Sequence, residues 1–396
     1  MTCLSRLLYL AIAYLLLLPI GFCRAQSQTP GFFPAILVKA QHEDNILRSE
    51  SERESDSVLM VAPSLLYIGL MGKQSLNLLY RGDFGYFQHR DTEDFMDHSV
   101  DARFSLDLGP TLKINIRGSI QDVHEARGSS GARTEMDIEP DRARQNALGG
   151  ELIYGRRTST AQILLAYLDN ERLYTNNDQE SRDRVFNNGM AVFFVNLGPK
   201  TSLFAEARQS HVDYLNNAAM DLDSVENSVM VGVRWEATAK TTGEIKLGYI
   251  SKNLKDPALD DFAGRGLEVH LLWEPKTYSR LNFIVSRQTD ETTQIGSSYF
   301  VGNRIFAQWE HEFSDRLGIE MSLDYETDEF SRLREDDLFF GKIGVGYQLL
   351  RWLNIKAQYR YSSRSSNMKG INYKVNIMSL VFVTDFFKGV PVPTVK

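Results

Sequence analysis

Acidic and basic residues recur two positions apart along this 396-residue chain, within segments whose intervening positions are apolar. In an extended strand, residues two positions apart point to the same side, so each charged set would share one face. Charges on the inner face of a pore can select solutes, although they can also simply pair across neighbouring strands. The candidates for lining a lumen and contacting a solute are Arg81, Asp83, Asp101, Arg103, Lys113, Arg117, Arg234, Glu236, Glu244, Lys246, Glu268, Arg304, Glu310, Lys356 and Arg360, with Glu206, Arg208, His270 and Glu312 on the same faces.

The residues that catalysis or metal binding would need are scattered. The histidines are spread over the chain, and none lies in a recognisable nucleophile motif. Cys3 and Cys23 are the only cysteines, and both belong to the leader described below. His42, Glu43 and Asp44 are adjacent, but successive strand residues face opposite sides and do not converge on a metal. We therefore expect a protein that is not an enzyme, with no catalytic residues, no metal site and no cofactor.

The elements that must position the charges are stretches of alternating apolar and polar residues. In residues 111–121, Leu112, Ile114 and Ile116 share one face, while Lys113 and Arg117 share the other. One face suits lipid and the other suits a water-filled lumen, which is typical of an all-β, transmembrane, antiparallel up-and-down β-barrel. About eighteen strands are expected, starting near Phe33, Ser57, Gln74, Asp94, Thr111, Arg144, Ser159, Asp183, Lys200, Ser224, Lys240, Asp261, Tyr278, Phe300, Arg316, Asp337, Arg351 and Gly370.

The connections between these stretches alternate in length. Residues 72–73, 109–110 and 198–199 form short turns, whereas 46–56 and 126–143 form long loops. Short turns are typical of the periplasmic side of an outer-membrane barrel and long loops of the extracellular side, so both termini are expected in the periplasm. The first strand is the least regular, because residues 32–38 are continuously apolar and include Pro34, which lacks a ladder donor. Without that strand the count falls by one and the topology fails.

The N-terminus indicates secretion. Arg6 precedes an apolar stretch, 7–20, and residues 23–25 resemble a cleavage site, which predicts a signal peptide over 1–25. The barrel is then expected over 26–387 and a short periplasmic tail over 388–396. The mean hydropathy of −0.29 is too polar for a helical membrane protein. Removing Arg6 and Arg24 with the leader takes the net charge from −7 to −9, which argues against a nucleic-acid or anionic-lipid partner. An outer-membrane barrel would have outer-membrane lipid and lipopolysaccharide as its surroundings.

The first hundred mature residues carry a family resemblance. Asp44-Asn45 follows the first strand, Ser55-Asp56 precedes the second, and Pro63, the stretch 78–80 and Tyr86 come next. This arrangement resembles the β-barrel porin family 2, whose members resemble outer-membrane barrels encoded in exopolysaccharide and capsule clusters. The resemblance implies a channel for export of a polysaccharide, working with periplasmic export machinery. The inward aromatic residues Phe87, Phe204, Phe306 and Phe340 would then be candidate sugar-stacking surfaces.

Two other functions remain open at this point. A general diffusion porin for small hydrophilic solutes would follow from the strand number alone. A structural or assembly barrel would recruit partners through its loops or through residues 387–396. The sequence leaves undecided which polymer or solute is handled, whether the loop 126–143 plugs the lumen, the charge selectivity, and whether the barrel is a monomer or a trimer.

Overall fold

The computed structural model describes residues 29–128, 139–216, 221–238, 240–292, 297–332 and 334–384. These ranges form a single 18-stranded antiparallel sheet and two short 3-10 helices, η1 (Asp91–Glu93) and η2 (Glu180–Arg182). Within them, no helix has the length and apolar character that crossing a bilayer requires. The strands are β1 (Gly31–Glu43), β2 (Asp56–Met71), β3 (Gln74–Phe87), β4 (Phe95–Asp107), β5 (Leu112–His124), β6 (Arg142–Tyr154), β7 (Ala161–Tyr174), β8 (Arg184–Gly198), β9 (Thr201–Tyr214), β10 (Ser224–Thr238), β11 (Thr241–Leu254), β12 (Phe262–Lys276), β13 (Ser279–Glu291), β14 (Tyr299–Glu312), β15 (Leu317–Phe330), β16 (Glu335–Leu350), β17 (Leu353–Ser366) and β18 (Tyr373–Thr384).

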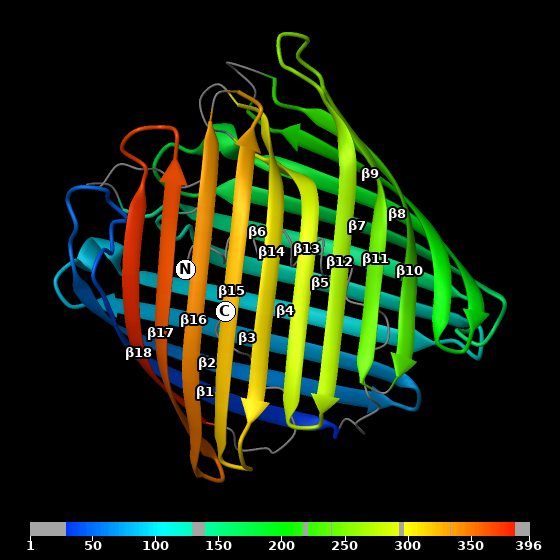
Figure 1. The fold of residues 1–396 in the computed structure, drawn as a ribbon, viewed down its shortest axis with the longest axis horizontal. Helices are drawn as coiled ribbons and strands as arrows, with labels where there is room; N and C mark the ends of the chain where they lie inside the picture. Colours follow the sequence, from blue (N-terminus) through cyan, green and yellow to red (C-terminus); the bar gives the residue numbers. More distant parts are fainter. Residues whose placement is uncertain are drawn as a thin grey trace.

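The sheet closes on itself into a barrel. Each strand pairs with its neighbours in sequence, and β1 pairs with both β2 and β18. Closure leaves sheet edges only at strand ends, such as the start of β1, and pairing on both sides is how a strand-built protein satisfies its backbone groups without water. In Figure 1 the strands β10 to β18 run upright along the front wall, and β1 to β6 cross behind them. The predicted fold and strand number are confirmed.

The first strand is a full member of the barrel. Pairing of β1 with β18 begins at Leu37, whereas pairing with β2 begins at Gly31. Pro34 therefore lies where β1 has only one neighbour, and its missing N–H group costs no bond to β18. Pro34 thus lies in the part of β1 where a missing N–H group breaks no ladder bond to β18.

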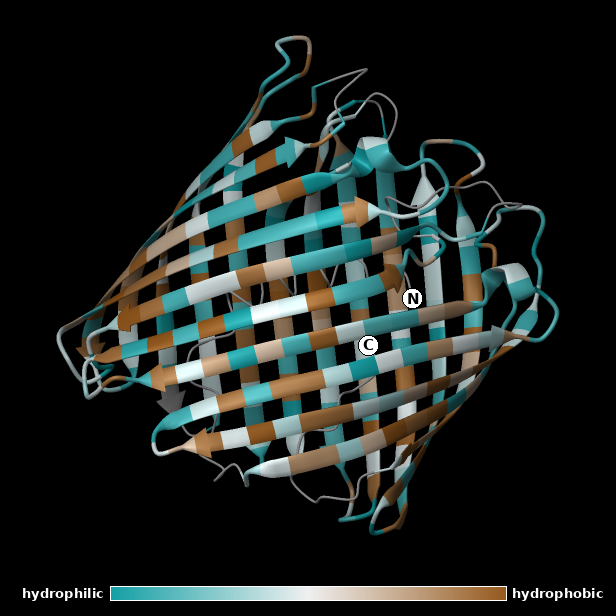
Figure 2. Ribbon diagram, turned by 180° about the vertical axis from the view of Figure 1, so that it is seen from behind, coloured by the Kyte–Doolittle hydropathy of each residue, from teal (hydrophilic) through white to brown (hydrophobic). Residues whose placement is uncertain are grey.

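Side chains alternate between the two faces of the wall. Along β7, Leu164 is 3% exposed and points inward, while its neighbour Leu165 is 48% exposed and points outward. Figure 2 shows this alternation as brown and teal bands that follow one another along the strands. The period of two is a consequence of strand geometry, and it separates an apolar outer surface from an inner surface rich in polar residues.

The two ends of the barrel differ in the length of their connections. At one end, β2 and β3 are joined by residues 72–73, where Gly72 adopts the positive φ of 64° that this tight turn requires. At the other end lie longer loops, of which 125–141 connects β5 to β6. Both Gly31 and Thr384, where the first strand begins and the last one ends, lie at the short-turn end.

The predicted strand starts differ from the observed ones by a few residues. The largest shifts occur beside loops; for example, β18 begins at Tyr373 rather than near Gly370, which adopts a positive φ of 85° in the preceding turn. The predicted signal peptide 1–25 and tail 388–396 lie outside the described residues. The boundaries at residues 25 and 387 therefore stay predictions.

Candidate functional site: the lumen and its loop-side mouth

The strand register places the predicted charged residues on the inner face of the wall. Lys246 on β11 lies opposite Glu268 on β12, and Glu244 lies opposite Arg234 on β10. Direct partners across a ladder share a face, so these charges line one surface. The register also places Arg103 on β4 directly opposite Arg117 on β5.

Most of the predicted residues are brought together in ion pairs across or along the wall. The closest nitrogen–oxygen distances are 2.7 Å for Arg81–Asp83, 3.0 Å for Arg117–Glu151, 2.7 Å for Arg234–Glu244, 3.1 Å for Lys246–Glu268, 2.6 Å for Arg304–Asp324 and 3.7 Å for Glu310–Arg280, and Glu236 pairs with Arg157. Among the described residues, Asp101, Arg103, Lys113, Lys356 and Arg360 form no ion pair, and Arg360 instead donates a 3.4 Å hydrogen bond to Gln41. The wall therefore contains both neutralised and unneutralised charges.

The most buried of these pairs form a network on β9, β11 and β12. The ammonium of Lys246 lies 3.0 Å from Glu206 and 3.1 Å from Glu268, and Lys246 is only 1% exposed. Arg208 adds a 2.7 Å contact to Glu206. Because each carboxylate is already engaged, this network braces the wall and leaves little charge for a solute.

Sequence reasoning missed Asp324, the partner of the predicted Arg304, and it missed both members of the pair Arg334–Asp336. Arg304 forms two hydrogen bonds of 2.7 and 2.6 Å with Asp324, and Arg334 does the same with Asp336 at 2.9 and 2.6 Å. Paired N–H···O bonds of this kind are strong and geometrically specific. The period-two pattern could have identified both acids: Asp324 stands between Leu323 and Tyr325, which point outward, and Asp336 shares a face with Phe340, which was predicted to point inward.

The inward aromatic residues differ in how accessible they are. Phe204 is only 5% exposed; its ring lies against Gly232 on the next strand, where an added Cβ would be 2.5 Å from the ring, and the guanidinium of Arg234 stands 5.8 Å from its centroid. Phe87, Phe306 and Phe340 are half-buried. Phe204 is thus a wall-filling residue and offers no free face for stacking a sugar, contrary to the expectation from sequence.

The loop that leaves β5 crosses the mouth of the barrel. The Gly128 carbonyl accepts a 2.7 Å hydrogen bond from Arg364 on β17 and a 3.4 Å bond from the Tyr373 hydroxyl on β18. Its neighbour Arg127 forms two bonds, of 2.7 and 2.5 Å, with Glu93 in η1. Since β18, β1, β2, β3 and β4 separate β5 from β17 along the wall, these contacts carry the loop across the part of the mouth next to those five strands. Residues 129–138 of this loop lie outside the described residues.

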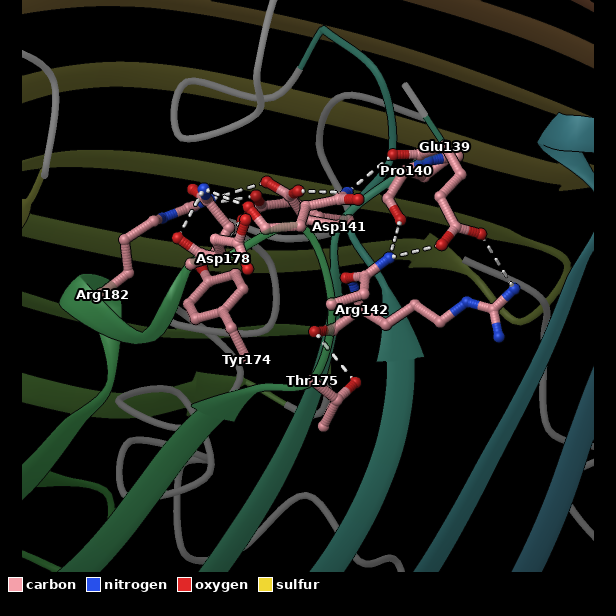
Figure 3. A network of polar contacts seen from close by, with 12 residues as sticks. Glu139, Pro140, Asp141, Arg142, Tyr174, Thr175, Asp178 and Arg182 are labelled. Carbon is pink, nitrogen blue, oxygen red and sulfur yellow. Dashed lines mark hydrogen bonds and ion pairs between the residues drawn. The ribbon is translucent and has the colours of Figure 1, made fainter. Parts of the chain in front are cut away.

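A buried ionic network fixes the base of the same loop. Glu125 lies 2.8 Å from Arg182 and 3.2 Å from Arg172, and Arg182 also lies 2.9 Å from Asp141. Figure 3 shows Arg182 reaching toward Asp141 beside the ring of Tyr174, whose centroid is 4.1 Å from the guanidinium. Burial alone would raise the pKa of Glu125, but Arg182 and Arg172 hold it below its ordinary value. The burial of Arg182 favours its neutral form, yet Glu125 raises the pKa of Arg182 overall.

The lumen and its mouth form a polar passage with fixed charges. Among the described residues, no three His, Cys, Asp or Glu side chains are grouped so that they could hold a metal ion. What the arrangement can do is admit water and polar solutes along the wall and restrict them where Arg127 and Gly128 lie over the mouth.

Comparison with solved structures finds barrels of the same fold. OccK2 (OpdF) of Pseudomonas aeruginosa, crystallised in complex with glucuronate, is 9% identical and has a TM-score of 0.50, over 91% of this chain and 100% of that one. OpdK from the same organism is 10% identical, with a TM-score of 0.47, over 89% of this chain and 98% of its own. OccK3 (OpdO) is 11% identical, with a TM-score of 0.47, over 90% and 96%. At these identities the likeness shows the fold alone.

None of the curated proteins compared with this chain matches it. The family described as "Putative beta-barrel porin 2" matches residues 31–385, which covers the whole observed barrel from the start of β1 to the end of β18. Its description names a porin and no polymer. The chain is therefore an outer-membrane β-barrel porin, and it belongs to the Putative beta-barrel porin 2 family.

Proposed function

We propose that this porin is a passive channel for small hydrophilic solutes across the outer membrane. The observation that carries the proposal is the loop segment at Gly128, which is bonded across the mouth to Arg364 and Tyr373. A segment held over the opening divides the passage, and a small solute can pass beside it. Charged and polar side chains on the inner wall supply the weak, repeated contacts that permit conduction.

Polysaccharide export, expected from the resemblance, is not what we propose. A polymer in transit would occupy the mouth continuously. The bonds from Gly128 to Arg364 and Tyr373 would then have to stay broken for as long as the polymer is passing. Of the four aromatic residues considered for stacking a sugar, Phe204 is buried in the wall. The family description adds a channel activity without naming a polymer.

The proposal includes an orientation in the membrane. The short turns and both chain termini would face the periplasm. The long loops, with the buried network of Glu125 and Arg182, would face the outside of the cell. Outer-membrane lipid would contact the apolar outer face, with lipopolysaccharide around the loop end.

The experiment is reconstitution of the refolded barrel in a planar lipid bilayer and in liposomes loaded with a small sugar. We expect discrete, steady conductance steps and osmotic swelling that falls as the sugar becomes larger. A gene deletion that traps polysaccharide in the periplasm, combined with a barrel that neither conducts nor swells liposomes, would contradict the proposal and favour export.

A further inference from the structure

The strands β12 and β13 separate from each other at the loop end of the barrel. Their pairing ends, on the side of the loops, with Leu267 opposite Arg287. Toward the loops from this pair, β12 reaches to Phe262 and stays paired with β11, while β13 reaches to Glu291 and stays paired with β14. Residues 288–291 therefore have no ladder partner on the side of β12, and we call them the β13 edge.

The β13 edge lies over the inner face of the neighbouring strands. The Thr289 hydroxyl donates a hydrogen bond to Glu226 on β10, and Glu291 forms an ion pair with Lys252 on β11. Glu226 and Lys252 lie opposite each other on the inner face, which Lys252 shares with Lys246. In a continuous sheet β13 would stand three strand spacings, roughly 14 Å, from β10, which is farther than a threonine and a glutamate can bridge. The edge must therefore overlap β11 and β12 on the lumen side.

Burial along β14 supports this overlap. Val301 and Tyr299 share a face with Ile305, which is 50% exposed on the outside of the barrel, yet they are only 5% and 6% exposed. Val301 lies directly opposite Thr289, and the ring centroid of Tyr299 lies 5.8 Å from that of Phe262 on β12. The outer face of the β13–β14 hairpin thus becomes buried where it passes to the lumen side of β12.

Lys252 differs from the other buried lysine of β11 in where its partner lies. Both Lys252 and Lys246 are 1% exposed. The partners of Lys246 are Glu206 on β9 and Glu268 on β12, in the continuous part of the wall. The partner of Lys252 is Glu291, which belongs to the separated edge. Breaking a buried ion pair leaves an uncompensated charge, so the pair resists movement of the edge away from β11.

We infer that Lys252 is a positioning residue that holds the β13 edge inside the barrel through Glu291, and that this edge limits the size of solutes entering at the loop end. If the edge moved outward and continued the ladder in its present register, Gly266 would lie opposite Gln288. The lumen would then gain the space that the edge now occupies. The inference rests on the proposed function, because it names a residue that sets the size limit of the channel.

The first experiment measures how the β13 edge is held and involves no transport. Val301→Cys places a thiol on the buried face, in a full-length chain whose two other cysteines, Cys3 and Cys23, are replaced with Ser. A maleimide should modify this thiol about tenfold faster when Lys252→Met is added, because losing one charge-assisted bond shifts the balance between held and released edge by about that factor.

The matched control is Lys246→Met, on the same strand and equally buried. Its partners lie in the continuous wall, so it should change the rate of modification by less than about twofold. The double variant Thr289→Val/Glu291→Gln weakens the same contacts from the side of the edge and should behave like Lys252→Met. Circular dichroism and unheated electrophoresis establish that each variant is folded.

The second experiment measures the pore. In planar bilayers Lys252→Met should give larger conductance steps than the wild type, and liposomes that contain it should swell in larger sugars. Lys246→Met should match the wild type in both measurements. Equal rates of modification in folded Lys252→Met and Lys246→Met would overturn the inference. Faster modification in Lys252→Met without any change in conductance or size limit would overturn its second half, the control of solute size.

The same proteins separate this inference from the proposed function. If modification of the thiol depends on Lys252 but the barrel conducts no current, the channel proposal fails and the role of Lys252 in holding the edge stands. If the barrel conducts and neither modification nor conductance depends on Lys252, the channel proposal stands and the inference fails.

Discussion

The guanidinium of Arg364 on β17 donates a 2.7 Å hydrogen bond to the carbonyl oxygen of Gly128, in the loop that leaves β5, although five strands separate β5 from β17 along the wall. Arg364 also lies 3.6 Å from Asp336, whose other partner is Arg334. A residue that is fixed in the wall thus holds a loop over the opening. We therefore expect the width of the passage to depend on whether this bond is made.

Replacing Arg364 with Met should release the loop and increase the current through single channels. Asp336 keeps its bidentate bond with Arg334, so the wall itself should stay folded. Tyr373→Phe removes only the 3.4 Å bond to Gly128 and should have a smaller effect in the same direction. Single-channel recordings of both variants test this, and equal conductance in wild type and Arg364→Met would show that the loop does not restrict the passage.

Replacing Glu125 with Gln should loosen the base of the same loop. Arg182 and Arg172 lose the charge that faces them in a site where all three side chains are nearly fully buried. Breaking one partner of a buried ionic network costs about 3–5 kcal/mol. Hydrogen exchange of the loop amides should therefore become faster, while exchange in β11 and β12 should not change. Protection equal to that of the wild type would contradict the role of Glu125.

Acidification should open the loop only at low pH. The pKa of Glu125 in the folded protein is lower than its unfolded value of about 4.3. Its contribution to stability is therefore fully present above about pH 4.3 and is lost as the pH falls through the lower, folded value. Channel current should be steady between neutral pH and about pH 5 and change below about pH 4. In Glu125→Gln this transition should be absent, because the side chain no longer titrates.

The period-two pattern predicted the barrel well because strand geometry alone decides which face a residue occupies. Arg234 and Glu244 belong to no recognisable motif, yet the period-two spacing places both on one inner surface. In the structure they form an ion pair of 2.7 Å. The pattern does not say which partner a charge selects, since that depends on register and on side-chain reach. The inward position of Lys39 was missed because the apolar stretch before it obscured the alternation that Lys39, Gln41 and Glu43 display.

The loop contacts could not be predicted for a different reason. Gly128 and Arg364 are 236 residues apart, and their meeting depends on how a loop folds after the barrel has closed. Neither hydrophobic period nor turn chemistry encodes such a contact. The network of Glu125, Arg172 and Arg182 likewise joins the loop after β5 to the end of β7 and to η2, and no regular pattern in the sequence connects these three segments.

Replacing Lys246 with Met should destabilise the barrel without unfolding it. Glu206 keeps its 2.7 Å contact with Arg208, but Glu268 retains only a distant contact of 3.9 Å. The expected loss in the free energy of unfolding is about 1–3 kcal/mol. Lys342→Met should cost less than about 1 kcal/mol, because Lys342 and Glu320 have side chains that are 23% and 22% exposed. Denaturant unfolding in lipid vesicles compares the two, and an equal cost would show that burial does not set the strength of these pairs.

Arginine substitutions on the two faces of one strand should show directly which face contacts lipid and which faces the lumen. Ile305 on β14 is 50% exposed on the outer face, near the middle of the strand, while Gln308 faces inward, 2.9 Å from Glu310 and 3.3 Å from Glu320. A charge at the bilayer midplane costs about 2–4 kcal/mol, so Ile305→Arg should lower the free energy of unfolding in vesicles by that amount. Gln308→Arg instead places its guanidinium beside two carboxylates and should change stability by less than about 1 kcal/mol. The same difference should shrink in detergent, where water reaches the outer face more easily. Equal losses for the two variants in vesicles would mean that the outer face of β14 does not contact lipid.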